Sequence, residues 1–522
     1  MPFSPPSSPR LAIIGGGITG LAAAHRALEL TPAAQISIFE ASGRLGGLLQ
    51  TERRDGYLIE RSADMFTTRE PWALDLCRRV GIQLPLPLGE GRGEGVSSDG
   101  KGDPHPNPLP KGEGTELIET NRQHRRAFVV HKGKLVPVPE GFTLMSPAKV
   151  WPILKSPLLS PFGKLRLAWE YFTPKKKDDA DESLESFVTR RFGRDAFDRL
   201  IQPLIGGIYT ADPSLLSMQA TLPQFVEMER RSGSLIRGVR GQGSGVSSQK
   251  AVGSKQESGA RYGMFLAPRD GMQRLVDAVA GKLPPGVVRL NARVERLMRA
   301  VDGSKWQVVI ASEEPREFDG VILASPAPVT GKLLEDIDEE LSRLVGSIPQ
   351  AGCNVAILGY RREQIAHPLD GFGFVVPTIE KRRIIAGSFA SIKFPGRAPE
   401  GKVLLRVFIG GALQPELLSL SDAETSNIVL EELCDLLGIS GEPEFCDIAH
   451  WHGAMPQYHV GHLDKVQQIE ERTAKFPGLA IAGNSYRGVG VPFCIHVGEA
   501  AAERIMGGLS TALRGRAEGV KP

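Results

Sequence analysis

Residues 11–20 read LAIIGGGITG, and this stretch decides the fold. The apolar run over 11–14 predicts a short buried strand, and the glycines after it predict a tight turn into a helix over 21–30. Residues 35–39 alternate like a second strand. Strand, helix and strand with short connections form a β-α-β unit, which begins an open parallel sheet. The sequence therefore predicts an α/β protein.

The glycines of this turn match the pattern G-x-G-x-x-G. Gly15 permits the tight turn, Gly17 lets the backbone approach a pyrophosphate, and Gly20 allows close packing of the helix. With Ile18 and Thr19 they form a helix N-terminus whose free N–H groups and positive dipole end suit phosphates. The motif alone is weak, because a plain turn between strand and helix shows the same pattern.

Acidic and basic residues strengthen the case for a dinucleotide. Glu40 follows the second strand, where an acid binds ribose hydroxyls, and Ala41 comes next. Gly46 and Gly47 would let the backbone reach a diphosphate, while Arg44 would supply positive charge. Together these residues predict dinucleotide binding.

Composition and charge set the limits. The chain has 522 residues, 41% hydrophobic and 24% charged, which is typical of a globular protein of two or three domains. A net charge of +3 gives no basis for a nucleic-acid binder. Five scattered cysteines fit neither a disulfide framework nor a zinc site, and they favour a reducing cytoplasm: Cys77, Cys353, Cys434, Cys446 and Cys494.

No targeting or membrane-spanning segment is expected. The apolar run over 11–14 stops at glycines and reads as a strand, not as part of a signal peptide. No apolar stretch approaches the roughly 20 residues that a membrane span needs. We therefore expect a protein that is soluble or lies on a membrane surface.

The extension from Glu40 to Gly47 resembles the flavoprotein family of amine oxidases, phytoene desaturases and protoporphyrinogen oxidases. The resemblance implies FAD, with a second binding segment near the C-terminus. It places a loop and the helix after it at the pyrimidine end of the flavin, and a valine in an inner strand at the adenine. The corresponding residues here are Gly483, Asn484, Val489, Val491 and Val294. Val294 has an equally good interpretation as a core strand residue.

Several independent strings sharpen the resemblance to oxygen-dependent porphyrinogen oxidases. They are residues 207–218, 394–399, 409–411 and 455–462. The resemblance implies six-electron oxidation of a porphyrinogen to a porphyrin in haem biosynthesis, with molecular oxygen as acceptor and hydrogen peroxide as product. Protoporphyrinogen IX and coproporphyrinogen III both stay open as substrates. The flavin carries the chemistry, so the protein needs an apolar slot and a cation for propionates.

The resemblance also nominates substrate-binding residues. Val375 and Phe408 stand at ring-contacting positions, and Ser388 stands at a third, where plant relatives carry an apolar residue. The family's propionate arginine matches Ala127, so we nominate its neighbour Arg126. An ordinary core residue at Val375 and a solvated arginine at Arg126 are the competing interpretations.

We expect a doubly wound FAD-binding domain, a mixed-sheet substrate domain and a helical, membrane-facing insertion. The FAD-binding domain takes residues 1–87, 261–330 and 448–522, the substrate domain 121–140 and 331–447, and the helical domain 141–237. Segments 88–120 and 238–260 are low-complexity insertions rich in glycine and in proline or serine, to which we assign no chemistry.

The family resemblance implies peripheral contact with the inner membrane face through the helical domain, and a homodimer. The histidines, among them His452, His459 and His462, lack metal-ligand spacing, so no metal is expected. Cys494 suggests a covalent flavin link, although a buried structural cysteine explains it better.

Three alternative functions remain at this stage. An amine oxidase would place an aromatic cage beside the flavin, and the C-terminal loop offers only Tyr486. A carotenoid desaturase would use the same fold. A non-enzymatic carrier that has lost its flavin is opposed by the intact glycine motif and Glu40.

Overall fold

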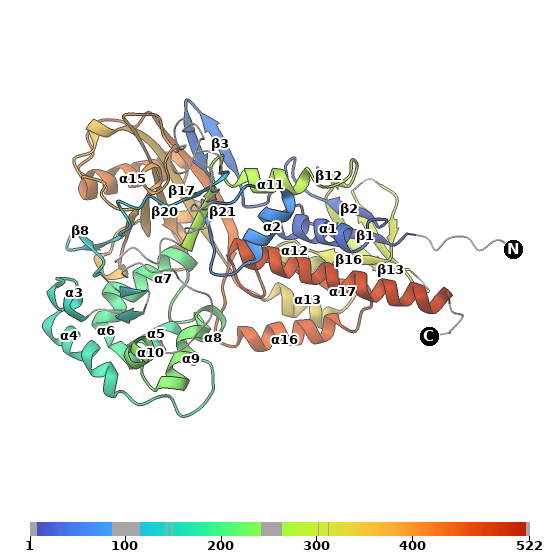
Figure 1. Ribbon diagram of the computed structural model, residues 1–522, viewed down its shortest axis with the longest axis horizontal. Helices are drawn as coiled ribbons and strands as arrows, with labels where there is room; N and C mark the ends of the chain where they lie inside the picture. Colours follow the sequence, from blue (N-terminus) through green and yellow to red (C-terminus); the bar gives the residue numbers. More distant parts are fainter. Residues whose placement is uncertain are drawn as a thin grey trace, which may run out of the picture.

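The computed structural model describes residues 8–85, 115–140, 142–143, 145–147, 150–241, 264–300, 302–311 and 313–517. The two predicted insertions, 88–120 and 238–260, lie largely outside these residues. Figure 1 shows an α/β part that contains both chain ends, a second sheet, and a group of helices beside that sheet. This arrangement confirms the predicted α/β class with a separate sheet and a helical part.

The α/β part is built on a parallel sheet of five strands in the order β12-β2-β1-β16-β22. Its inner strands are almost completely buried and apolar, as expected for strands covered on both faces. They come from three distant segments of the chain: β1 (Arg10–Ile14), β2 (Gln35–Phe39), β12 (Val288–Arg289), β16 (Gly320–Leu323) and β22 (Leu479–Ile481).

Different layers cover the two faces of this sheet. One face packs against α1 (Ile18–Leu30), α2 (Trp72–Val80), α11 (Gln273–Ala280) and α17 (Val491–Ala517). The other face carries a three-stranded antiparallel meander and three helices. These are β13 (Val294–Arg299), β14 (Trp306–Ile310), β15 (Arg316–Phe318), α12 (Ala327–Leu333), α13 (Glu339–Gly346) and α16 (His462–Thr473).

Helices α1 and α17 lie side by side, as Figure 1 shows. A Cβ atom at Gly498 would lie 2.3 Å from the carbonyl oxygen of Thr19, so only glycine allows this approach. The contact, in the third turn of α17, brings the N-terminal part of this helix close to the glycine motif at the start of α1. The C-terminal helix therefore reaches the predicted nucleotide site.

The second sheet has seven strands in the order β21-β17-β20-β19-β18-β7-β8. All neighbours are antiparallel except β18 and β7, so the sheet is mixed as predicted. Helix α15 (Asp422–Leu437) packs on one face. The strands are β7 (Phe128–His131), β8 (Lys134–Pro137), β17 (Gln350–Arg361), β18 (Gly373–Val375), β19 (Ala386–Phe389), β20 (Lys402–Gly410) and β21 (Phe445–Pro456).

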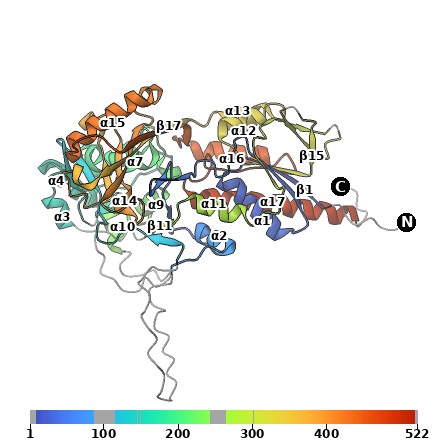
Figure 2. The same cartoon turned by 90° about the horizontal axis from the view of Figure 1, so that it is seen from above.

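Short elements join the two sheets. A hairpin and a small three-stranded sheet lie between them, and Figure 2 shows β11 beneath the second sheet. The hairpin consists of β3 (Thr51–Arg54) and β4 (Tyr57–Glu60), and the small sheet of β5 (Phe66–Thr67), β11 (Phe265–Pro268) and β6 (Leu117–Glu119). The short helix α14 (Ala390–Lys393) follows β19. The loop between β4 and β5 thus lies at the junction of the two halves.

The helical part has its own apolar core. Its α5 (Leu184–Phe192) begins after Ser183, whose side chain caps the helix by accepting a hydrogen bond from the Ser186 amide at 3.2 Å. Two short strands, β9 (Phe142–Thr143) and β10 (Ser146–Pro147), precede the helices. The helices and helical turns are, in chain order, α3 (Val150–Lys155), α4 (Pro161–Ala168), the 3₁₀ turn η1 (Trp169–Phe172), α5 (Leu184–Phe192), α6 (Arg194–Ala196), the π-helical turn η2 (Phe197–Ile201), α7 (Gln202–Tyr209), α8 (Met218–Thr221), α9 (Pro223–Ser232) and α10 (Leu235–Gly241).

Two predicted domain boundaries need correction. The boundary between 330 and 331 falls inside α12, which packs entirely on the α/β part. The boundary between 447 and 448 falls inside β21, a strand of 12 residues that pairs along β17. Composition shows no break at either position: the packing of α12 decides the first boundary, and the pairing of β21 with β17 decides the second.

Candidate active site

The glycine motif forms a turn in which side chains do not fit. Gly15 has φ +115°, and a Cβ atom on it would lie 2.6 Å from the Ala324 carbonyl oxygen. A Cβ atom on Gly20 would lie 2.0 Å from the carbonyl oxygen of Gly15. The turn therefore holds the start of α1, with Ile18 and Thr19 in its first turn, against the end of β1. This leaves backbone N–H groups at the position where a pyrophosphate binds.

The second glycine pair meets the first loop through its backbone. The Gly46 amide donates to the Gly16 carbonyl oxygen at 2.9 Å. A Cβ atom on Gly47 would lie 3.3 Å from the Cα atom of Gly17, and both glycines of the pair have positive φ. Two stretches without side chains thus face each other, and a diphosphate needs this kind of cradle.

Glu40 points at the glycine turn from the end of β2. Its carboxylate accepts the Gly16 amide at 2.7 Å and the Ser42 amide at 2.8 Å, while Ala41 beside it is exposed. The Ala292 amide donates to the Glu40 backbone carbonyl at 2.8 Å. This bond brings the buried Val294, at the start of β13, close to the acid. The predicted ribose and adenine residues therefore lie together.

Arg44 is engaged within its own loop. Its guanidinium donates to the carbonyl oxygens of Leu45 at 3.1 Å and Leu49 at 2.9 Å, and also to that of Gly47. Burial lowers the pKa of Arg44, and nearby Glu40 opposes this effect. The arginine holds the second glycine loop in shape, while its predicted charge contact with a diphosphate stays a prediction.

The C-terminal segment approaches the same region. Gly483, with φ +137°, follows β22, and α17 begins at Val491. The Tyr458 hydroxyl donates to the Asn484 carbonyl oxygen, which ties this loop to the chain leaving β21. The start of α17 directs its positive dipole end toward the junction of the two halves.

Cys494 lies in the first turn of α17 and contacts the Val489 carbonyl oxygen at 4.0 Å. It is buried, and burial raises the pKa of its thiol to about 11. A protonated, buried thiol fits the structural interpretation of this cysteine.

A flavin dinucleotide fits these residues. The two glycine loops offer backbone N–H groups for the pyrophosphate, and the acid at the end of β2 suits the ribose. The N-terminus of α17 suits the pyrimidine end of the flavin. The individual contacts of Gly15, Glu40 and the other nominated residues with FAD remain predictions.

The register of the second sheet places the three substrate-contact nominees on one face. Val375 lies opposite Ala386, which lies opposite Phe408. Ser388 occupies the next row, opposite Arg406. Residues directly opposite, and residues two apart along a strand, point to the same side of a sheet. Val375, Ser388 and Phe408 therefore form one surface, away from the core under α15.

Helix α7 approaches this surface from the helical part. A Cβ atom at Gly207 would lie 3.2 Å from the Cγ1 atom of Val375, so glycine lets the helix pack directly on β18. Gly207, in the first of the family-like strings (residues 207–218), thus lies beside Val375 in the predicted substrate surface.

Arg126 lies just before β7, the neighbour of β18, but its charge is already paired. It donates to the Asp370 carbonyl oxygen at 2.6 Å and forms an ion pair with the Asp370 carboxylate at 2.6 Å. Arg125 is bound to Glu119 at 3.3 Å. Arg126 as the propionate-binding residue therefore stays a prediction, and binding would have to compete with Asp370.

Sequence reasoning missed a group of buried charges at the junction: Asp64, Lys393 and Arg406. A signal was present, because residues 403–409 read VLLRVFI and an arginine within an apolar strand must find a buried partner. The partner's identity depends on tertiary packing, since Asp64 belongs to a loop of the other half.

Other polar groups have structural explanations. His462 is buried, stacks on Tyr458 with ring centroids 4.0 Å apart, and has Nε2 2.9 Å from the Tyr486 carbonyl oxygen. Burial lowers its pKa to about 4, so it is neutral. Among the described residues, no three or more His, Cys, Asp and Glu side chains are grouped as metal ligands would be.

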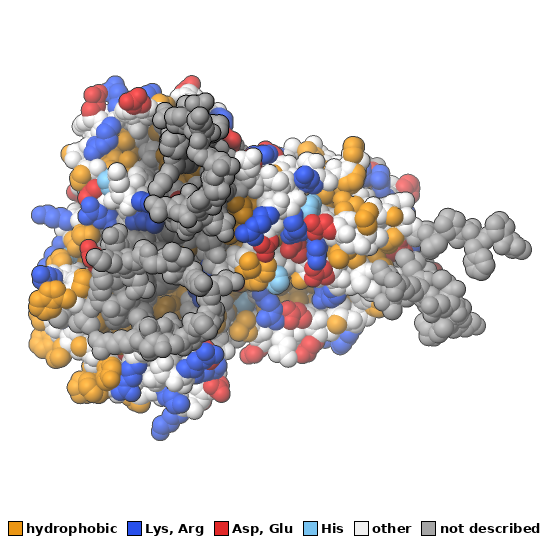
Figure 3. All heavy atoms as spheres, in the orientation of Figure 1, with side chains coloured by type: hydrophobic (Ala, Val, Ile, Leu, Met, Phe, Trp, Pro, Cys, Tyr) orange, Lys and Arg blue, Asp and Glu red, His pale blue; other side chains and the backbone are white. Residues whose placement is uncertain are grey.

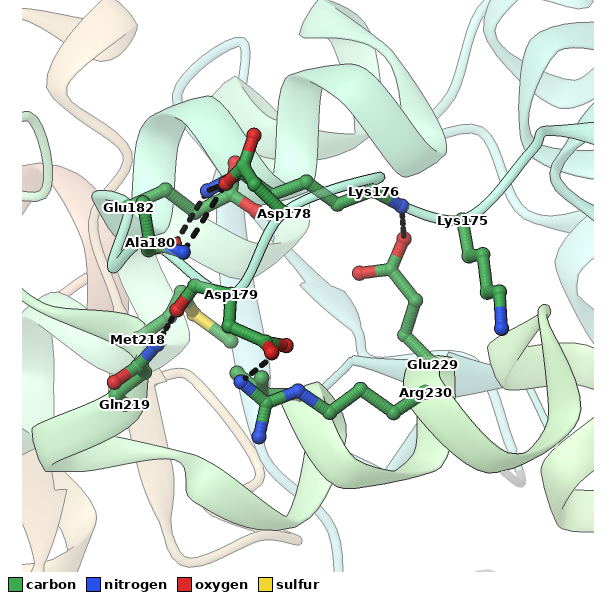
Figure 4. A pocket seen from close by; sticks show the side chains of 11 residues that line it. Lys175, Lys176, Asp178, Asp179, Ala180, Glu182, Met218, Gln219, Glu229 and Arg230 are labelled. Atoms are coloured by element: carbon green, nitrogen blue, oxygen red, sulfur yellow. Dashed lines mark hydrogen bonds and ion pairs between the residues drawn. The ribbon is translucent and has the colours of Figure 1, made fainter.

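One cavity lies away from this site, and a second borders its C-terminal loop at Ala482 and Tyr486. The first, of about 40 Å³, lies at the loop around Lys175 to Glu182, and Figure 4 shows charged side chains pairing around it, such as Arg230 with Asp179 at 3.0 Å. It is too small for an organic ligand. The other, of about 430 Å³, lies between α16 and α17 at the edge of β22.

The comparisons with known proteins agree with this site. The family of flavin-containing amine oxidoreductases matches residues 18–506, and the chain belongs to this family. It is an oxidoreductase whose cofactor is FAD. Within the family it is similar to porphyrinogen oxidases. It is 33% identical to the coproporphyrinogen III oxidase of Bacillus subtilis over 94% of this chain and 96% of that protein.

Further relatives point the same way. The chain is 30% identical to the coproporphyrinogen III oxidase of Staphylococcus aureus, covering 95% of this chain and 98% of the relative. It is 28% identical to the mitochondrial protoporphyrinogen oxidase of Nicotiana tabacum, covering 96% and 95%.

Solved structures extend the likeness to the whole fold. A protein of Exiguobacterium sp. 255-15, provisionally named protoporphyrinogen oxidase, superposes with a TM-score of 0.79 at 28% identity, covering 96% of this chain and 99% of that one. A putrescine oxidase has a TM-score of 0.62 at 16% identity, covering 96% and 99%, which shows the fold alone.

Proposed function

We propose that this protein oxidises coproporphyrinogen III to coproporphyrin III in haem biosynthesis, with molecular oxygen as acceptor and hydrogen peroxide as product. The observation that carries the proposal is the single face shared by Val375, Ser388 and Phe408, which hydrogen bonds of Arg406 and Ser62 link to Leu48, beside the second glycine loop. The similarity to coproporphyrinogen III oxidases over nearly the full chain supports it.

The chemistry asks little of the side chains. When bound, FAD would supply the redox chemistry, as the acceptor of hydride from the bridging carbons and the donor of electrons to oxygen. Three two-electron oxidations would convert one porphyrinogen and three O₂ into one porphyrin and three H₂O₂. Val375 and Phe408 would hold the macrocycle by apolar contact, and the start of α17 would favour negative charge at the pyrimidine end.

Protoporphyrinogen IX is the second candidate substrate. The two porphyrinogens differ in charge, because coproporphyrinogen III carries four carboxylates where protoporphyrinogen IX carries two and has vinyl groups instead. Identities of 30–33% to coproporphyrinogen III oxidases against 28% to a plant protoporphyrinogen oxidase favour the former. The nearby polar Ser388 and buried cations also suit the more charged substrate.

An amine substrate is less well supported. Tyr486, the only tyrosine in the predicted C-terminal loop, packs in the core on the meander side of the α/β sheet. It is therefore not available for an aromatic cage. The amine oxidases among the solved structures share the fold at 16% identity or less.

The test is an assay in air with each porphyrinogen in turn, in which porphyrin fluorescence and peroxide are recorded together. We expect coproporphyrin III to form with three peroxides per porphyrin, and faster than protoporphyrin IX. Turnover of putrescine or another amine, with neither porphyrinogen oxidised, would overturn the proposal.

We further propose peripheral contact between the helical part and a membrane. Large apolar side chains on α3, α4 and η1 are exposed, with Phe162 84% and Trp169 59% accessible. Figure 3 shows hydrophobic side chains gathered at this end of the molecule. Exposed aromatic residues beside Lys155 and Lys164 suit an anionic bilayer surface. No helix among the described residues is both long and apolar enough to cross a bilayer.

Sedimentation with vesicles tests this contact. We expect binding to vesicles that contain phosphatidylglycerol, and a several-fold loss in Trp169→Glu. Arg231→Glu, on the exposed surface of α9, is the matched control. Equal binding of all three proteins would refute the membrane contact.

We also propose that the protein is cytoplasmic and forms a homodimer. Light scattering of the purified protein checks the dimer.

A further inference from the structure

A buried ion cluster lies where the two halves of the molecule meet. It consists of Asp64, in the loop between β4 and β5, Lys393, at the end of α14, and Arg406, in β20. The Lys393 Nζ atom lies 2.6 Å from an Asp64 carboxylate oxygen, and an Arg406 nitrogen lies 3.2 Å from the same oxygen. Arg406 is only 2% exposed. One carboxylate is therefore shared between two buried cations.

Neighbouring groups do not restore the balance. Arg397 is also buried and donates to the carbonyl oxygens of Pro268 at 2.9 Å and Arg269 at 2.7 Å. Glu60 is buried, and its carboxylate accepts the Met272 amide at 2.7 Å. Burial raises the pKa of Glu60, and the nearby Arg397 and Arg406 oppose this effect. Even with both carboxylates ionised, the three buried cations Lys393, Arg397 and Arg406 face two buried anions, while Arg53 and Asp270 near Arg397 form an exposed ion pair with each other.

The cluster lies between the second glycine loop and the sheet face that carries Phe408. Arg406 donates to the Ser62 carbonyl oxygen, and the Ser62 hydroxyl donates to the carbonyl oxygen of Leu48, next to the second glycine loop. Strand β5, just after Asp64, packs against α17. Arg406 also shares its sheet face with Phe408. Elements from both the cofactor side and the substrate side therefore surround the cluster.

A surplus buried cation is costly unless an anion compensates it. Within the described residues, the Nε atom of Arg406 is buried without a hydrogen-bond partner. We infer that Lys393 and Arg406 are positioning residues whose surplus charge stabilises an anion bound at this junction. That anion is the reduced flavin ring or a carboxylate of the substrate. The second source rests on the proposed function, and the first does not.

The first experiment measures the midpoint potential of the flavin in the purified holoenzyme without substrate. We expect Lys393→Met to lower the potential, because it removes positive charge that favours the reduced, anionic flavin. Asp64→Asn should raise it, and Arg406→Lys, which keeps the charge, should change it less than Arg406→Met. Lys402→Met is the matched control, since Lys402 lies in the same strand but is paired with Glu444 at the surface.

The second experiment measures the binding of coproporphyrin III, with four carboxylates, and protoporphyrin IX, with two. If the anion is a substrate carboxylate, Lys393→Met should weaken coproporphyrin III binding several-fold more than protoporphyrin IX binding. A shift in potential assigns the anion to the flavin, and a selective loss of binding assigns it to the substrate. The inference is overturned if variants that retain flavin change neither the midpoint potential of the flavin nor the ratio of the affinities for coproporphyrin III and protoporphyrin IX. An enzyme that oxidises neither porphyrinogen would refute the proposed function but leave the potential measurement valid.

Discussion

The predicted cofactor cradle and the predicted substrate face are built from different materials. The cradle consists of backbone at Gly15, Gly20 and Gly46, where even a Cβ atom meets other atoms at less than 3 Å. The substrate face consists of side chains that project from strands, such as Val375, Ser388 and Phe408. A backbone site admits almost no substitution, whereas a side-chain site changes with each residue. The same fold can therefore keep one cofactor and vary its substrate.

The largest expected effect comes from the cradle. Gly20→Ala places a Cβ atom 2.0 Å from the Gly15 carbonyl oxygen, so the turn must move and the pyrophosphate position is lost. We expect protein without yellow flavin absorbance. The matched control is Gly508→Ala in α17, where a Cβ atom meets nothing within 4 Å, and it should retain full flavin content. Equal flavin content in both variants would show that the turn at Gly20 accommodates a side chain, against the difference drawn between the two regions.

A change in the substrate face should leave the flavin in place. Phe408→Ala removes an aromatic side chain that we expect to contact the macrocycle, which corresponds to about 2 kcal/mol and a roughly thirtyfold fall in kcat/KM. The flavin spectrum should stay normal. Loss of flavin together with activity would mean that the two regions are not separable in this way.

A substitution of His462 tests the contact between the C-terminal loop and the chain that leaves β21. His462 begins α16, stacks on Tyr458, and contacts the C-terminal loop at Tyr486. Its pKa is about 4 in the folded protein against 6.5 in the unfolded chain, so only the unfolded chain gains a proton as pH falls from 6.5 to 4. Stability should decrease over this window by at most about 3 kcal/mol. Thermal unfolding of His462→Gln should show a shallower pH dependence, while exposed His452→Gln should match the parent protein.

The smallest effect is a shift in substrate preference. Ser388→Leu adds an apolar side chain to the substrate face, next to Arg406. We expect the ratio of kcat/KM for protoporphyrinogen IX to that for coproporphyrinogen III to rise about fourfold, in line with roughly 0.8 kcal/mol for one buried CH₂ group. Ser388→Ala serves as the control and should leave the ratio close to its original value. A fall in the ratio with leucine would contradict the placement of Ser388 at the substrate.

The two regions also differ in how far the sequence predicts them. The glycine spacing and Glu40 predicted the cradle because its parts lie close together in the chain and follow backbone rules. Val375, Ser388 and Phe408 came only from family resemblance, because their common face depends on strand pairing over long separations. The same reason explains the missed Asp64 and Lys393 contact and the boundary misplaced inside β21.

The most direct test of coproporphyrinogen III oxidation is to mix the yellow holoenzyme with this substrate in the absence of oxygen and record the flavin absorbance. We predict rapid bleaching of the flavin, followed by return of the yellow colour and release of peroxide when air is admitted. A flavin that stays oxidised with both coproporphyrinogen III and protoporphyrinogen IX would contradict the proposed function, although the FAD fold would stand.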